Sequence, residues 1–139
     1  MIYFRKEQIP DIIPQRDPII MIDSATIFDA SSLQTTLTIH EKNWFVNNGI
    51  FLEAGLMEHA AQSAAALIGV EAIMKNEKPK IGLIGEIKNF ETFRLAKVNE
   101  TLTTDLSVLT TIENVTIVET KTKINEELIS TGRIMVFLT

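Results

Sequence analysis

The 139-residue sequence contains no cysteine, which excludes disulfides, thiolate nucleophiles and cysteine-ligated zinc or iron–sulfur centres. It has only two histidines, His40 and His59, which lie far apart in the sequence without metal-ligand spacing. We therefore expect no metal and no cofactor. Glycine-rich phosphate loops and the GxSxG motif are also missing, so the sequence contains no motif that indicates nucleotide binding or serine hydrolase activity. The lack of cysteine fits a reducing, cytoplasmic location.

Positive charge is scarce as well. The sequence has 13 Lys and Arg against 18 Asp and Glu, a net charge of -5, and no basic cluster, so we expect no nucleic-acid partner. No apolar run approaches the ~18 residues of a membrane helix, and the first residues lack the pattern of a secretory signal. With 45% hydrophobic residues, the composition predicts one globular domain over residues 1–139.

One strong helix is predicted over residues 51–74. This segment is rich in alanine, leucine and methionine, which favour helix, and the turn residues Asn47-Asn48-Gly49 precede it. Charged residues are nearly absent between Gln62 and Val70. A helix that is apolar almost all round is buried almost all round, so a sheet must wrap around it.

Strands are predicted on both sides of this helix. Prolines at positions 10, 14 and 18 limit the start of the chain to a short helical turn around residues 6–13. Strands are expected at residues 19–28, 33–40, 80–90, 100–111, 114–124 and 128–138. Alternation is clear in the fourth of these, where one side is apolar and the other carries Thr101, Thr103, Asp105 and Ser107.

Strands grouped around a single buried helix indicate an α+β fold rather than alternating βαβ units. We predict a strongly bent antiparallel sheet around a central helix. A cystatin-like or cone-shaped sheet with the helix on one face is the alternative. A single copy of such a fold exposes a sheet edge and part of the helix, so we expect a homodimer or a higher oligomer.

Three motifs carry a resemblance to a known family. They are Ile-Pro-Gln-Arg-Asp-Pro-Ile-Ile-Met-Ile-Asp at residues 13–23, Leu-Thr-Ile-His-Glu at 37–41 and Glu-His-Ala-Ala-Gln at 58–62. They resemble the opening, the second strand and the Glu-x-x-x-Gln helix of 3-hydroxyacyl-ACP dehydratases of fatty-acid synthesis (the FabZ/FabA type). The resemblance implies a hotdog fold, in which a curved six-stranded antiparallel sheet wraps a long central helix. It also implies a thioester substrate on acyl carrier protein or CoA.

The loop before the helix departs from that family. The dehydratases carry a catalytic histidine in a His-Phe-Pro-Gly loop, whereas residues 44–50 here are Trp-Phe-Val-Asn-Asn-Gly-Ile. Counting forward from the strand places Asn47 at the histidine position, and counting back from Glu58 places Trp44 there. The dehydratase-like proteins of aryl-polyene and related pigment clusters, with a Gly-rich loop and a similar helix motif, resemble this sequence better.

The resemblance implies that Glu58 is the catalytic acid. Its place in an apolar helix favours the protonated carboxyl that such a role needs, although a half-buried interface glutamate is the structural alternative. Gln62 lies one turn later on the same face, where it contacts either Glu58 or the substrate. Asn47, Asn48 and Gly49 are candidate substrate-binding residues, because their amide groups and the helix N-terminus suit a thioester carbonyl.

The remaining candidates have plainer alternatives. His59 points ~100° away from Glu58 around the helix, so we expect a core or interface histidine, and we expect His40 to be exposed. Lys88, Arg94, Lys97 and Arg16 could attract an acidic carrier protein, or simply solvate the surface. Met21, Met57, Phe90 and Phe93 could line an acyl tunnel, or belong to the core.

Three functions follow from these residues. The first is a dehydratase of 3-hydroxyacyl thioesters, in fatty-acid or polyene-type lipid biosynthesis. The second is an acyl-thioesterase on the same scaffold, in which Glu58 activates water. The third is a non-catalytic hotdog subunit that pairs with an active dehydratase, and the missing loop histidine supports it.

Overall fold

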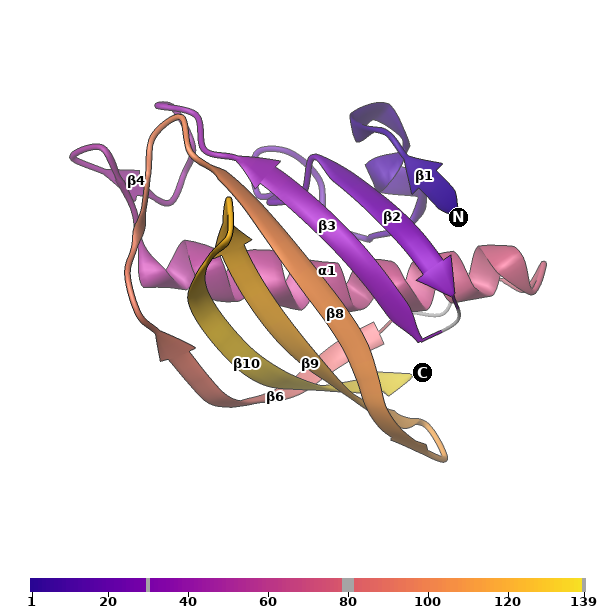
Figure 1. Ribbon diagram of the computed structural model, residues 1–139. Helices are drawn as coiled ribbons and strands as arrows, with labels where there is room; N and C mark the ends of the chain where they lie inside the picture. The colour runs from indigo at the N-terminus through magenta and orange to yellow at the C-terminus, as the bar shows by residue number, and fades with distance from the viewer. Residues whose placement is uncertain (30, 79–81, 139) are drawn as a thin grey trace.

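A computed structural model describes residues 1–29, 31–78 and 82–138 of the chain. One long helix, α1 (Glu53–Met74), lies against one face of a large curved sheet (Figure 1). Within those ranges the sheet has seven antiparallel strands, in the spatial order β1 (Ile2–Phe4), β2 (Ser24–Asp29), β3 (Ser32–Thr38), β8 (Thr101–Ile112), β9 (Val115–Ile124), β10 (Glu127–Leu138) and β6 (Gly82–Thr92). The predicted α+β fold, with an antiparallel sheet around one helix, is confirmed.

The predicted number of six strands is wrong, because residues 2–4 form β1 and extend the sheet beyond β2. A second, small sheet contains β4 (Val46–Asn47), β5 (Ile50–Phe51) and β7 (Ala96–Lys97). Strands of two or three residues are too short to show a periodic pattern, so the sequence does not reveal them. The short helical turn that the prolines allow is present as a 3-10 helix over Lys6–Asp11.

The helix α1 is buried along most of its length, as its composition predicts. It begins at Glu53, two residues later than expected. Its small residues let other segments pass very close. At Gly69, the backbone carbonyl of Ile12 occupies the space that a Cβ atom would need. The helix therefore packs against the N-terminal segment as well as against the sheet.

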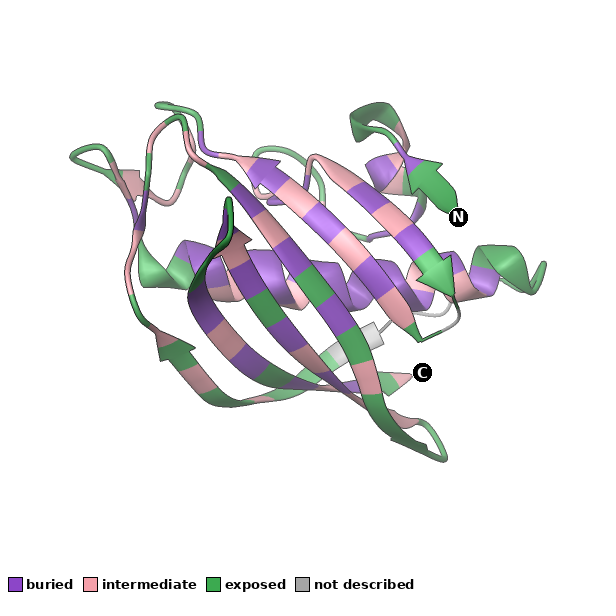
Figure 2. Cartoon of the chain, in the orientation of Figure 1, coloured by how far each residue is buried: buried purple, intermediate pink, exposed green. Residues whose placement is uncertain are grey.

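The strands alternate between buried and exposed residues, which Figure 2 shows as bands across the sheet. In β8, Leu102, Thr104 and Leu106 are buried on the side of α1, whereas Thr101 and Asp105 are exposed. The predicted alternation of this strand is confirmed. The predicted strand over residues 80–90 is observed as β6 and continues to Thr92, while its first two residues lie outside the described residues.

The strand predicted over residues 19–28 begins only at Ser24. Residues 19–21 instead run beside α1, and side chains of the helix satisfy their backbone groups. Gln62 bonds the carbonyl of Ile19 and the amide of Met21, and His59 bonds the carbonyl of Met21. The apolar pattern of this segment reflects real burial, but its hydrogen-bonding partner is the helix rather than another strand.

Candidate active site

The candidate acid Glu58 lies on α1, one helical turn before Gln62. The Gln62 side-chain amide donates a hydrogen bond to Glu58 Oε1 over 2.7 Å. This is one of the two contacts expected for Gln62, and it follows from the four-residue spacing on one helix face. Glu58 itself is half-buried in the single chain.

The orientation of Gln62 is fixed on both sides of its amide. Its Oε1 accepts a hydrogen bond from the backbone amide of Met21 at 2.7 Å, and its Nε2 also donates to the carbonyl of Ile19 at 2.8 Å. Flipping the amide would place donor against donor and acceptor against acceptor. Gln62 therefore always presents an N–H to Glu58, and the second carboxylate oxygen of Glu58 stays free of this contact.

His59 is fully buried between α1 and the sheet, as a core histidine is expected to be. Its Nδ1 lies 2.6 Å from the Met21 carbonyl, which can only accept, so Nδ1 carries the proton. Its Nε2 then accepts from the hydroxyl of Thr104 at 2.8 Å, and Thr104 accepts from Thr122. Burial lowers the pKa of His59 to about 4, so the ring is neutral near pH 7.

The candidate substrate-binding residues Asn47, Asn48 and Gly49 lie in the hairpin that joins β4 to β5, just before α1. Asn48 and Gly49 have φ values of 51° and 77°, the left-handed conformation that Asn-Gly turns adopt. All three residues are exposed. The Gly49 carbonyl accepts a hydrogen bond from the backbone amide of Val98 at 3.1 Å, which ties the hairpin to the segment around β7.

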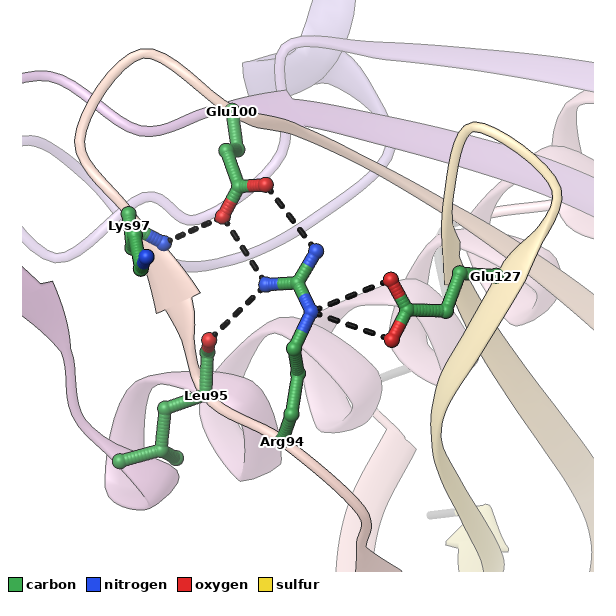
Figure 3. A network of polar contacts seen from close by, with 5 residues as sticks. All are labelled: Arg94, Leu95, Lys97, Glu100 and Glu127. Carbon is green, nitrogen blue, oxygen red and sulfur yellow. Dashed lines mark hydrogen bonds and ion pairs between the residues drawn. The ribbon is translucent and has the colours of Figure 1, made fainter.

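Arg94 forms the centre of a polar network near this hairpin (Figure 3). Its guanidinium group makes two hydrogen bonds of 3.0 Å to the two carboxylate oxygens of Glu100. Its Nε donates to both oxygens of Glu127 at 3.2 Å, and it also bonds the carbonyl of Leu95. The hydrogen bonds from Arg94 lower the pKa of Glu100. Two carboxylates thus compensate Arg94, which weakens its case as an attractor of acidic proteins.

The other proposed cationic and apolar residues are spread over different surroundings. Lys88 lies 3.6 Å from Glu86, and Arg16 donates to the carbonyls of Ile13 and Gln15. Met21 is buried in the core and Phe90 packs against it, whereas Phe93 is exposed and Met57 half-buried. Of these four apolar candidates, Met21 and Phe90 fit the core alternative.

A small hollow of about 40 Å³ lies between the C-terminal end of α1 and Leu138 of β10. A larger one of about 380 Å³ is lined by residues of β6, β9 and β10, including Glu91, Lys121 and Arg133. Among the described residues there is no group of three acidic or histidine side chains that could hold a metal ion, and no helix long and apolar enough to cross a membrane.

The comparison with known families decides the identity. The model of the ApeP-like family, described as ApeP dehydratase, matches residues 7–139. The chain belongs to the ApeP-like dehydratase family. This confirms the resemblance to the dehydratase-like proteins of aryl-polyene clusters. No curated protein matches the sequence of this ApeP-like chain.

Solved structures confirm the hotdog fold of this ApeP-like chain. The dehydratase heterocomplex ApeI:P from Xenorhabdus doucetiae superposes with a TM-score of 0.87 at 14% identity, covering 94% of this chain and 90% of that one. Cj0977, a sigma28-regulated virulence protein from Campylobacter jejuni, gives 0.75 at 15% identity, with 96% and 89% covered. A hypothetical thioesterase with coenzyme A from Streptococcus pneumoniae TIGR4 gives 0.67 at 10% identity, with 83% and 85% covered.

Proposed function

We propose that this protein is the acid-bearing subunit of a dehydratase that acts on 3-hydroxyacyl thioesters of acyl carrier protein or CoA, in fatty-acid or polyene-type lipid biosynthesis. The observation that carries the proposal is the Glu58–Gln62 pair in a chain of the ApeP-like dehydratase family. Glu58 is half-buried on the helix, and Gln62 holds one of its oxygens. The other oxygen is left for the substrate.

The reaction assigns Glu58 a single task. A base removes the proton on the carbon next to the thioester carbonyl, and the Cα–Cβ double bond forms as the Cβ–O bond breaks. Glu58 donates its proton to the departing hydroxyl group, which leaves as water. Backbone N–H groups of the Asn47–Gly49 turn would bind the thioester oxygen, where negative charge develops.

The base must come from elsewhere, because this chain offers no suitable histidine. Both ring nitrogens of His59 are occupied within the core, His40 is exposed beyond the end of β3, and the 44–50 loop contains no histidine. A related dehydratase subunit that carries the loop histidine would complete the site. The ApeI:P structure is a complex of dehydratases, which supports this arrangement. The edge strand β6 and the exposed side of α1 are the surfaces that such a partner would cover.

A second candidate function is a non-catalytic subunit, and the missing histidine favours it. Such a subunit would hold its partner or the acyl chain, and Glu58 would be dispensable. An acyl-thioesterase is the remaining possibility on this scaffold, and the thioesterase among the structural neighbours supports it.

One assay separates the three. The protein is purified alone, and also together with a dehydratase-type partner from the same genome, and each sample receives a 3-hydroxyacyl thioester and its trans-2-enoyl counterpart. The proposal predicts interconversion of the two thioesters by the assembly, measured by enoyl absorbance, without release of free thiol. Thiol release would indicate a thioesterase. Equal turnover by the partner alone would indicate a non-catalytic subunit.

A further inference from the structure

The segment 93–100 carries the Asn47–Gly49 turn on the body of the protein. Ile50 and Phe51 of β5 pair with Lys97 and Ala96 of β7, and the Val98 amide donates to the Gly49 carbonyl at 3.1 Å. The turn itself is exposed. On one side the turn is held by Phe51, which is fully buried in the core, and on the other by segment 93–100.

The two ends of segment 93–100 are hydrogen-bonded to different parts of the chain, one to β10 and the other to the residue that follows β3. The Phe93 amide donates to the Ile129 carbonyl of β10 at 2.7 Å. At the other end, the Asn99 amide donates to the Ile39 carbonyl at 2.7 Å, and the Ile39 amide donates to the Glu100 carbonyl at 2.9 Å. Between these anchors lies β7, which pairs with β5 just before the start of α1.

Arg94 links the start of this segment to its end and to the turn before β10. Its fork binds both oxygens of Glu100 at the end of the segment, and its Nε binds Glu127 in the turn before β10 (Figure 3). Glu100 Oε1 also accepts the backbone amide of Lys97 at 2.8 Å, so the same carboxylate holds β7, the strand that pairs with β5. A planar guanidinium group suits this task, because its donors have a fixed geometry.

We infer that Arg94 is a positioning residue for thioester binding. It fixes Glu100 and β7, and through them the Asn47–Gly49 turn that receives the thioester carbonyl. The inference rests on the proposed function, since it takes this turn as the binding loop. In this inference Arg94 holds a segment of its own chain in place, whereas the sequence suggested that it contacts an acidic carrier protein.

The test compares Arg94→Ala and Arg94→Lys with Lys75→Ala in the assembled protein. Lys75→Ala removes an ion pair to Glu71 of 2.8 Å at the opposite end of α1, so it controls for the loss of an exposed ion pair far from the turn. The first readout is amide hydrogen exchange at Val98 and Lys97. The second is the Kd for a non-reactive amide analogue of a 3-hydroxyacyl-CoA, which requires no turnover.

Arg94→Ala is expected to speed exchange at Val98 and Lys97 about tenfold and to raise the Kd about tenfold, because the several bonds it removes are partly exposed and each contributes little on its own. Arg94→Lys keeps the charge but not the fork, so it should recover only part of the affinity. Lys75→Ala should change neither readout. Thermal unfolding of each variant shows that the fold is retained.

Unchanged exchange at Val98 in Arg94→Ala would overturn the inference, and so would faster exchange with unaltered affinity. Full recovery by Arg94→Lys would show that charge alone matters, which also contradicts it. The failure of the proposed function is recognised separately, as absence of dehydratase turnover in the wild-type assembly.

Discussion

The Gln62 side chain donates a hydrogen bond of 2.7 Å to the Glu58 carboxylate, and the same amide is fixed by the backbone of residues 19 and 21. The helix motif Glu-x-x-x-Gln thus does two things. It attaches the N-terminal segment to α1, and it sets the orientation of the proposed acid. Gln62 therefore contributes both to the packing of the N-terminal segment and to the geometry of the proposed site.

Replacing Gln62 with leucine should lower the free energy of unfolding by about 2–4 kcal/mol, because the Met21 amide and the Ile19 carbonyl lose their partners in a buried place. Urea unfolding measures the change. The control is Gln34→Leu, which removes a hydrogen bond to Asp105 on the exposed face of the sheet and should cost less than about 1 kcal/mol. Equal losses in the two variants would contradict the role of Gln62.

His59 should make stability depend on pH. Its pKa is lowered to about 4 in the folded protein, from 6.5 in the unfolded chain. The unfolded state therefore binds more protons between these values, and stability falls as the pH drops from 6.5 to 4, by on the order of 3 kcal/mol in total. NMR of the His59 ring should show a neutral imidazole with the proton on Nδ1 down to pH 5. Titration near 6.5 would contradict the buried network.

The hydroxyl of Thr104 should matter more than that of its neighbour. Thr104→Val removes the donor to His59 Nε2 and the acceptor for Thr122, at a cost of about 1–3 kcal/mol. Thr103→Val, on the outward face of the same strand, should change stability by no more than about 0.5 kcal/mol. Thermal or urea unfolding of both variants checks the difference, and equal effects would contradict the network.

Gly69→Ala should destabilise the protein although alanine favours helix. At an open helix position this change stabilises by about 0.4–1 kcal/mol. Here the new Cβ would overlap with the Ile12 carbonyl, so α1 and the N-terminal segment must separate. We expect a loss of about 1–3 kcal/mol, as for other overpacked sites. The sign of the change in a urea titration is the test, and a gain in stability would contradict the close packing.

The sequence predicts the parts of this fold that have a clear period. The helix is recognised by its composition, and β8 to β10 by length, alternation and turn residues. Residues 19–21 are assigned wrongly, because their apolar side chains look the same whether a strand or the side chains of Gln62 and His59 satisfy the backbone. β1 and the small sheet are missed because two or three residues show no pattern.

In the candidate site, too, contacts between residues close in the sequence are predictable and contacts between distant residues are not. The Glu58–Gln62 contact is predictable because both residues lie four apart on one helix. The network around Arg94 is not, since Glu127 is 33 residues away in sequence and approaches only through the turn before β10. The sequence shows an unpaired cation there, whereas the fold supplies two carboxylates.

The most direct test of the account is the rate at which the assembled protein hydrates a trans-2-enoyl thioester when Glu58 is changed to glutamine. Glu58→Gln keeps the size of the side chain but removes the carboxyl group, which in this direction takes the proton from the attacking water, so the rate should fall about 10²–10⁴-fold. Glu53→Gln, an exposed glutamate in the first turn of the same helix, should retain the wild-type rate. Turnover by Glu58→Gln equal to that of Glu53→Gln would contradict the assignment of Glu58 as the acid.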